Sequence, residues 1–238
     1  MAAECTENIT VIVPTRAQSE TLSRLLDQIK RFGLSFVVVQ ASGTTMVPGY
    51  ADINAGGLWL QAPASRGGQV AAGIAECNTD WFWVLHDDSE IDIETVERLL
   101  NVVASGTPRW GRCNVYFKER GWPLRVIAAM MNLRSSLSKI CTGDQGMFFH
   151  RAHIDSVGGF PAQPLMEDIE LSVRLKGCAA KDFLALPAPL GTSGRRWLEQ
   201  GFILTILRMW WLRWRYFFGA DPGVLFLQYY RSGGIRPQ

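Results

Sequence analysis

Residues 81–89 read Trp-Phe-Trp-Val-Leu-His-Asp-Asp-Ser, an unbroken apolar run that stops at two adjacent carboxylates. A run of this kind between polar residues is typical of a strand that is buried on both faces, as in a parallel sheet. Similar runs alternate with stretches of helical periodicity along the first half of the chain. They fall at 9–14 (strand), 20–31 (helix), 36–39 (strand), 58–61 (strand), 69–77 (helix) and 93–104 (helix). The alternation predicts an α/β fold of Rossmann type, with a mostly parallel sheet flanked by helices.

The second half contains shorter elements and ends in a long aromatic helix. We expect strands at 112–118, 147–149 and 179–186, and helices at 124–137, 154–157, 166–175 and 196–218. Ligands of parallel sheets bind beyond the carboxyl ends of the strands, so the segments after Val13, Val39 and Leu85 should share one rim. We expect one α/β domain over 1–195 and a C-terminal helical extension over 196–238.

Composition excludes several classes of protein. Of the 238 residues, 47% are hydrophobic, which is enough for a core and excludes general disorder. The net charge of +2 is too balanced for a nucleic-acid binder. Five scattered cysteines without C-x-x-C spacing predict free thiols and no structural zinc site. No apolar run is long enough for a membrane-spanning helix, and Glu4 and Glu7 stand where a signal peptide would be basic, so we expect a cytoplasmic protein.

The acids after residue 85 suggest a metal site. Two carboxylates beside an apolar strand are costly unless a cation neutralises them, and Mg²⁺ typically takes one or two protein carboxylates plus substrate oxygens. A structural alternative is an N-cap for the helix at 93–104, a role that Asp92 or Ser89 could fill without Asp88. The local sequence leaves both readings open.

A second acidic segment, Met166-Glu167-Asp168-Ile169-Glu170, begins a predicted helix. Acids favour the positive end of a helix, and Glu170 can pair with Arg174 one turn on, so a structural role is sufficient by itself. The functional alternative is a general base, in which a carboxylate takes the proton of an attacking hydroxyl.

Two polar turns could bind substrate. Gly194-Arg195-Arg196-Trp197 offers guanidinium groups for a phosphate and an indole for stacking, although it could also be the solvated start of the last helix. Asp144 and Gln145 lie between two glycines and could meet a sugar hydroxyl, or serve only as turn residues.

The last helix is amphipathic. Its arginines at 208 and 215 oppose one apolar side formed by Ile203, Ile206, Leu207, Trp210, Trp214 and Phe217. A helix with this composition suits a membrane interface, but the same face could pack on the domain.

The order of these motifs resembles the family 2 glycosyltransferases of GT-A fold, and more closely the short bacterial branch of arsenosugar-biosynthesis-associated glycosyltransferases. The resemblance covers roughly residues 8 to 230. The segments that carry it are the strand ending in Pro14, Arg66-Gly67-Gly68-Gln69, His86-Asp87-Asp88-Ser89, Gly143-Asp144-Gln145-Gly146, Gly158-Gly159-Phe160-Pro161, Pro164-Leu165-Met166-Glu167-Asp168 and Arg195-Arg196-Trp197.

The resemblance implies an inverting transfer of a sugar from a nucleotide-diphosphate donor to an acceptor hydroxyl, with Mg²⁺ or Mn²⁺ as cofactor. It makes Asp88 the metal ligand and Asp168, beside Glu167, the general base. The remaining residues that it assigns to donor or diphosphate binding are Pro14, Gln40, Arg66, Gln69, Asp87, Arg195, Arg196 and Trp197. The acceptor stays open between a lipid-linked compound and a small molecule, and peripheral contact with the inner face of the membrane is compatible with both.

The sequence departs from the family pattern in the donor half. Gln40 stands where an Asp near the donor base is usual, Ala17-Gln18 replaces Asn-Glu, and Ala71 stands where an Asn is expected. These differences leave a second hypothesis, a non-catalytic sugar-nucleotide or membrane-surface binding protein on the same fold. A nucleotidyltransferase is disfavoured, because residues 14–18 contain no glycine.

Overall fold

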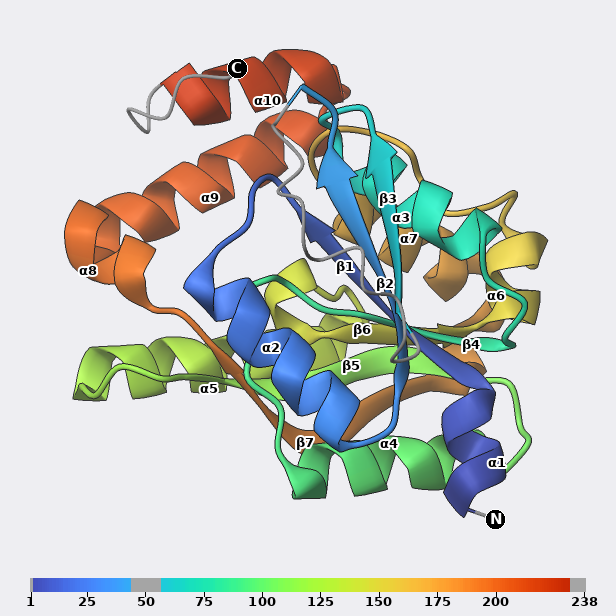
Figure 1. Ribbon diagram of the computed structural model, residues 1–238. Helices are drawn as coiled ribbons and strands as arrows, with labels where there is room; N and C mark the ends of the chain where they lie inside the picture. Colours follow the sequence, from blue (N-terminus) through green and yellow to red (C-terminus); the bar gives the residue numbers. More distant parts are fainter. Residues whose placement is uncertain (1, 44–56, 232–238) are drawn as a thin grey trace.

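The computed structural model describes residues 2–43 and 57–231 and centres on one mixed sheet (Figure 1). Its strands are β1 (Ile9–Thr15), β2 (Ser35–Ala41), β3 (Gly57–Ala62), β4 (Trp81–Val84), β5 (Trp110–Phe117), β6 (Met147–His150) and β7 (Phe183–Thr192). They lie in the order β3-β2-β1-β4-β6-β5-β7. Only β6 opposes its neighbours β4 and β5, and the other pairs are parallel. The prediction of a mostly parallel sheet is therefore confirmed.

Helices cover both faces of this sheet. The longer ones within the α/β part are α2 (Glu20–Arg31), α3 (Arg66–Ala75), α4 (Ile93–Ala104), α5 (Trp122–Ser138) and α7 (Glu167–Ala179). Shorter elements are α1 (Ala2–Glu7), η1 (Gly143–Gln145), α6 (Arg151–Ser156) and η2 (Ala180–Asp182). The chain ends in α8 (Arg195–Gln200), α9 (Phe202–Phe217) and α10 (Pro222–Arg231). None of the described helices is long and apolar enough to cross a bilayer.

Successive residues of the central strands enter opposite cores. Val11 and Trp83 pack with α2 and α4 on one side of the sheet, whereas Ile12 and Phe82 pack with α3 and α7 on the other. This alternation follows from the twofold side-chain period of a strand. Both sides are apolar, so these strands appear in the sequence as continuous runs rather than alternating ones.

The predicted elements are present, most of them with bounds shifted by one to four residues, and two differ more. The helices expected at 20–31 and 93–104 are confirmed to the residue. The strand expected at 179–186 begins only at Phe183 and continues to Thr192, because β7 is an edge strand that pairs with β5 and tolerates prolines. The single helix expected at 196–218 is broken at Gly201, whose φ of 82° lies in the left-handed region.

The C-terminal helices contact the domain through a small third core. Leu212 of α9 and Leu225 of α10 pack on Met166, the residue just before α7. Of the six residues of the apolar side described above, five are exposed and Ile206 is half-buried, and the helix contacts Met166 through its opposite face. All five cysteines are free, as expected.

Candidate functional site

The carboxyl ends of β1 and β4 meet at one rim of the sheet. The hydroxyl of Thr15, the last residue of β1, donates a 2.8 Å hydrogen bond to Asp87 Oδ2, in the loop after β4. From α3, Gln69 Nε2 donates to the carbonyls of Thr15 at 2.7 Å and Val39 at 2.6 Å. The ends of β1, β2 and β4 therefore share one rim, as predicted.

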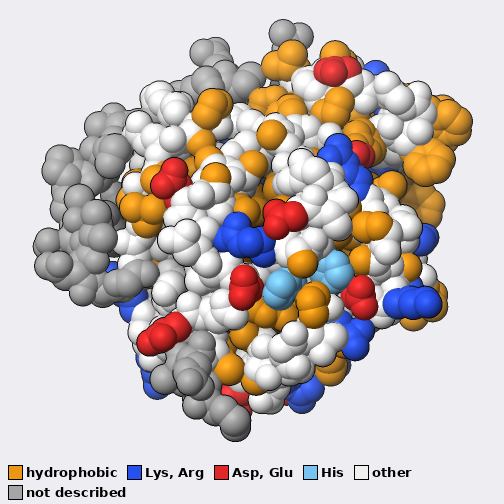
Figure 2. All heavy atoms as spheres, turned by 90° about the vertical axis from the view of Figure 1, so that its right-hand side faces the viewer, with side chains coloured by type: hydrophobic (Ala, Val, Ile, Leu, Met, Phe, Trp, Pro, Cys, Tyr) orange, Lys and Arg blue, Asp and Glu red, His pale blue; other side chains and the backbone are white. Residues whose placement is uncertain are grey.

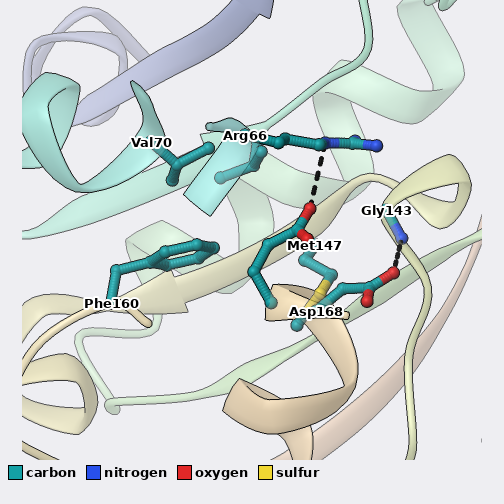
Figure 3. Close-up of a pocket in the computed structure, with 8 residues that line it drawn as sticks. Arg66, Val70, Gly143, Met147, Phe160 and Asp168 are labelled. Carbon is teal, nitrogen blue, oxygen red and sulfur yellow. Dashed lines mark hydrogen bonds and ion pairs between the residues drawn. The ribbon is translucent and has the colours of Figure 1, made fainter. Parts of the chain in front are cut away.

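The acidic segment of the second half reaches the same rim from α7. Glu167 is buried, and its Oε1 lies 3.2 Å from Nε of Arg66, the first residue of α3. Asp168 Oδ2 accepts a 2.7 Å hydrogen bond from the backbone N–H of Gly143, and Asp168 Oδ1 accepts one from the N–H of Ile169. Figure 3 shows both the ion pair and the bond to Gly143. These contacts fix the positions of both carboxylates.

A pocket lies between these elements (Figure 3). It is lined by Arg66, Val70, Val84, Gly143, Met147, Phe160, Glu167 and Asp168. Its polar groups are therefore two carboxylates and one guanidinium, set against an apolar wall. Asp88 is not part of this lining, but it is close enough to Asp144 for that charge to raise its pKa.

The turn η1 joins the two acidic segments. His86 Nδ1, in the loop after β4, lies 3.4 Å from Asp144 Oδ1. A Cβ placed on Gly143 would lie 2.5 Å from Arg66 Nη2 and 2.6 Å from His86 Nε2, so a glycine is required for this close approach. Residues from both halves of the chain thus surround one short turn.

Burial and charge shift three pKa values here. Burial, together with the charge of Asp168, raises the pKa of Glu167 to about 7, against the opposing effect of Arg66. Burial, then Asp144 and Asp87, raises the pKa of Asp88, and Lys118 opposes this. Burial, then Arg66 and Arg196, holds the pKa of His86 well below its ordinary value. Asp88 thus sits where negative charge is in excess and His86 is neutral, an arrangement that favours binding of a cation.

Asp88 fits the role of a metal ligand better than that of a helix cap. Its Oδ1 is buried and has no hydrogen-bond partner among the residues that the structure describes. Helix α4 is capped by Asp92, which accepts from the N–H of Thr95 at 2.8 Å. Over residues 2–43 and 57–231, no three His, Cys, Asp or Glu side chains form a metal-binding group. A divalent ion here would depend on substrate oxygens for most of its ligands, which is the usual situation for Mg²⁺.

The predicted Arg-Arg-Trp element lies at the start of α8. Arg195 and Arg196 are exposed, and Arg196 Nη1 donates to the Tyr229 hydroxyl. The indole of Trp197 makes an edge contact with Phe117, with ring centroids 6.1 Å apart. Arg196 is close enough to lower the pKa of His86, so it belongs to the electrostatic surroundings of the site.

Four of the predicted ligand-binding residues have internal partners. Gln145 is fully buried, its amide N–H groups donate to Asn132 and Ser135, and its carbonyl accepts from Thr142. Gln40 is buried and accepts from the indole N–H of Trp59 at 3.2 Å. Pro14 lies within β1, and Gln69 holds the two strand carbonyls. In this arrangement these four residues support the site from inside.

Sequence reasoning missed Lys118. Its Nζ donates a 2.8 Å hydrogen bond to the carbonyl oxygen of Asp88 and places a positive charge beside that carboxylate. The available signal was its position directly after β5, since polar residues at strand ends line the rim of an α/β sheet.

No protein-family model matches the chain, and no curated protein matches it in sequence. It is similar to solved structures. TarS 1–349 from S. aureus superposes with a TM-score of 0.58 at 14% identity, over 78% of this chain and 60% of that one. Glucosyl-3-phosphoglycerate synthase from Mycobacterium tuberculosis, in complex with Mn²⁺, UDP and glucosyl-3-phosphoglycerate, gives 0.57 at 15% identity, over 84% and 77%. GalNAc-T7 with UDP, GalNAc and Mn²⁺ gives 0.60 at 10% identity, over 78% and 44%.

These similarities establish a shared fold, that of the GT-A glycosyltransferases. The chain spans only 60% of the length of TarS 1–349. At identities of 10–15% the similarity extends to architecture alone.

Proposed function

We propose that the protein is a metal-dependent, inverting glycosyltransferase that moves a sugar from a nucleotide-diphosphate donor to an acceptor hydroxyl. The observation that carries the proposal is the meeting of two acidic segments around the turn at 143–145. His86, which directly precedes Asp87 and Asp88, and Asp168, which follows Glu167, come from opposite halves of the chain, yet both contact this turn. Membership of family 2, and of its arsenosugar-associated branch, is part of the same proposal.

Asp168 is the proposed general base. An inverting displacement needs a carboxylate that takes the proton of the acceptor hydroxyl as that oxygen attacks the anomeric carbon. The N–H groups of Gly143 and Ile169 hold the carboxylate of Asp168 in place, and Asp168 lines the pocket. Glu167 is paired with Arg66 and partly protonated near neutral pH, which suits a supporting role.

Asp88 is the residue proposed to hold Mg²⁺ or Mn²⁺. A bound divalent ion supplies neutralisation of the charge that grows on the leaving diphosphate. Arg66, Arg195 and Arg196 are the cations of this chain proposed to act on the same charge, and Trp197 the aromatic group beside them. Solved structures of the same fold contain UDP-GlcNAc, UDP or Mn²⁺, which supports a UDP-sugar as the first donor to test.

The division into an α/β domain over 1–195 and a C-terminal helical extension over 196–238, packed on the domain or membrane-associated, is part of the same proposal. We propose that the protein is cytoplasmic and makes peripheral contact with the inner face of the membrane. The acceptor class stays open between a lipid-linked compound and a small molecule.

Donor hydrolysis tests the proposal. The purified chain is incubated with a panel of sugar nucleotides and Mn²⁺, and release of nucleoside diphosphate is measured with and without candidate acceptors. We expect hydrolysis of at least one donor, and a loss of about 10²-fold or more for Asp168→Asn. The matched control is Asp27→Asn, an exposed acid on α2, which should leave the rate unchanged. Absence of turnover with every donor and acceptor would overturn the enzyme proposal.

The second candidate is a non-catalytic sugar-nucleotide binder. The observation that favours it is that two positions of the expected donor site lack the usual residues. Gln40 is buried against Trp59, and Ala71 stands where an Asn is expected. Calorimetric binding of a nucleotide diphosphate without turnover of any sugar nucleotide would select this function.

A further inference from the structure

Helix α9 presents a broad apolar stripe to solvent. Ile203 is 76% exposed, Trp210 68% and Phe217 85%, in a helix that buries only two of its sixteen residues. Together with the residue after the helix, the exposed side chains are Ile203, Leu204, Leu207, Trp210, Trp211, Trp214, Phe217 and Phe218. At 3.6 residues per turn they occupy one continuous arc of about 140°. A patch of this kind marks an interaction site rather than the ordinary scatter of surface hydrophobics.

The inner face of α9 is already occupied. Thr205 and Leu212 are buried, Leu212 packs on Met166, and the Tyr216 hydroxyl donates a 2.5 Å hydrogen bond to Glu170 Oε2. In Figure 1, α9 lies along the upper left of the molecule, outside the sheet. The stripe is the opposite face of the same helix. Because the inner face of α9 is held by these contacts, the stripe stays exposed in the folded chain.

The charge around the stripe is positive. Residues 195–231 contain six arginines and two acids, a net charge of +4, whereas the whole chain has +2. The remaining residues are therefore net −2, and the excess of positive charge is confined to these helices. Helix α9 has three arginines and no acid, at positions 208, 213 and 215, and all three flank the apolar arc.

This pattern fits one class of partner. Aromatic and aliphatic side chains on one side, flanked by arginines, match the boundary between acyl chains and anionic headgroups. A second copy of the chain fits less well, because a twofold contact would bring the arginines of both copies together without an acid on α9 to pair with them. On the side of the molecule seen in Figure 2, hydrophobic side chains are mostly scattered among polar and charged ones.

We propose that α9 docks on an anionic phospholipid bilayer, with its axis in the membrane plane and its stripe among the acyl chains. The inner face of the same helix packs on Met166, the residue just before the Glu167-Asp168 pair. A docked α9 would therefore hold these acids roughly one helix diameter, about 10 Å, from the lipid surface. The peripheral membrane contact is thus assigned to the exposed stripe of α9 and to anionic phospholipids. This assignment does not depend on glycosyl transfer.

Vesicle binding tests it without any sugar nucleotide. The full chain is co-sedimented with phosphatidylcholine vesicles, with and without about 30% phosphatidylglycerol, at ~0.1 M and ~0.5 M salt. We expect binding to the anionic vesicles that weakens with salt. Lipids brominated on the acyl chains should quench tryptophan fluorescence, because three tryptophans lie on the stripe.

Variants connect the binding to α9. Trp210→Ser with Trp214→Ser should lower the partition coefficient at least about tenfold. The matched control, Ile93→Ser with Val173→Ser, removes two exposed apolar side chains from α4 and α7 and should bind as wild type does. Circular dichroism and thermal melting establish that each variant is folded. If the tryptophan variant is not folded, Leu207→Gln with Phe217→Gln removes other side chains of the same stripe.

Three results would overturn the proposal. One is that wild type binds no vesicles, and another is that the α9 variants bind as strongly as wild type. The third is a dimer, seen by sedimentation equilibrium, that the α9 variants dissociate while lipid binding is absent, which would make a second copy the partner. Failure of glycosyl transfer alone would leave the vesicle result unchanged, so the two proposals can fail separately.

Discussion

The guanidinium of Arg66 lies 3.2 Å from the carboxylate of Glu167 and joins the first residue of α3 to the first residue of α7. These residues are 101 positions apart in the chain. Both residues line the pocket, and the contact holds a buried carboxylate, whose pKa burial raises to about 7, next to Asp168. Several measurable consequences follow from this arrangement and from its neighbours.

Glu167→Gln should stabilise the protein at pH 8. The pKa of Glu167 is about 7 in the folded chain, against 4.5 for an ordinary Glu, so the folded state holds this proton more tightly than the unfolded state. Its carboxyl group therefore lowers stability progressively as pH rises from about 4.5 to 7, by at most about 3 kcal/mol. Urea unfolding at pH 4.5 and pH 8 measures the difference, which should be present at pH 8 and absent at pH 4.5.

The matched variant is Glu97→Gln, at an exposed position on α4. It should change stability by less than about 0.5 kcal/mol at both pH values. A Glu167→Gln chain that is less stable than wild type at pH 8 would mean that the ion pair with Arg66 outweighs the cost of burial.

Asp88→Asn should keep or raise the stability of the metal-free chain and abolish its stabilisation by Mn²⁺ and UDP. The pKa of Asp88 is raised by burial and by Asp144 and Asp87, so the ionised carboxylate destabilises the folded chain at neutral pH. The amide removes that charge, and we expect an equal or higher Tm without metal. With Mn²⁺ and UDP, wild type should gain stability and the variant should not, because only a folded chain with Asp88 binds the ion. Thermal melting with and without Mn²⁺ and UDP measures both effects, and an equal gain in both chains would contradict the metal role.

Gly143→Ala should disrupt the site more than the fold. The added methyl group would lie about 2.5 Å from the ends of the Arg66 and His86 side chains, which must move aside. We expect the proposed donor hydrolysis to fall at least about tenfold, since a small displacement of positioned groups is costly. The control is Gly177→Ala in α7, where the methyl group meets nothing within 4 Å and should stabilise the helix by roughly 0.5–1 kcal/mol. Unchanged hydrolysis in Gly143→Ala would show that the turn does not position the reacting groups.

Gln69→Leu should destabilise the chain by about 2–4 kcal/mol. The side-chain N–H groups of Gln69 donate to the carbonyls of Thr15 and Val39, and leucine would remove both hydrogen bonds at about 1–2 kcal/mol each. Urea unfolding measures the loss. Gln61→Leu, at an exposed position of β3, is the control and should have little effect. A small effect at Gln69 would mean that water can replace its amide.

Much of the fold could be predicted because its signals are local. The apolar runs at 9–14 and 81–85 are buried strands, and the helical periodicity at 20–31 and 93–104 gives helices with those bounds. The reversal of β6 could not be read from its three apolar residues, because strand direction depends on the path of the chain between strands. Helix α1 was not predicted, since its six residues carry no strong periodicity.

The sequence by itself determined which residue types stand at the ends of the strands, and hence that acids and arginines would gather at one rim. Only the tertiary structure decided which of them face a pocket. Gln69 and Gln145 have the same side chain as an exposed glutamine, yet both are buried, and their amide N–H groups donate to main-chain or side-chain partners. The apolar stripe of α9 looks in the sequence like any helix face that packs on a core, and it is exposed because the opposite face of the helix packs on Met166. Hydrophobic periodicity is a property of neighbouring residues, whereas burial depends on which distant segments arrive at the same place.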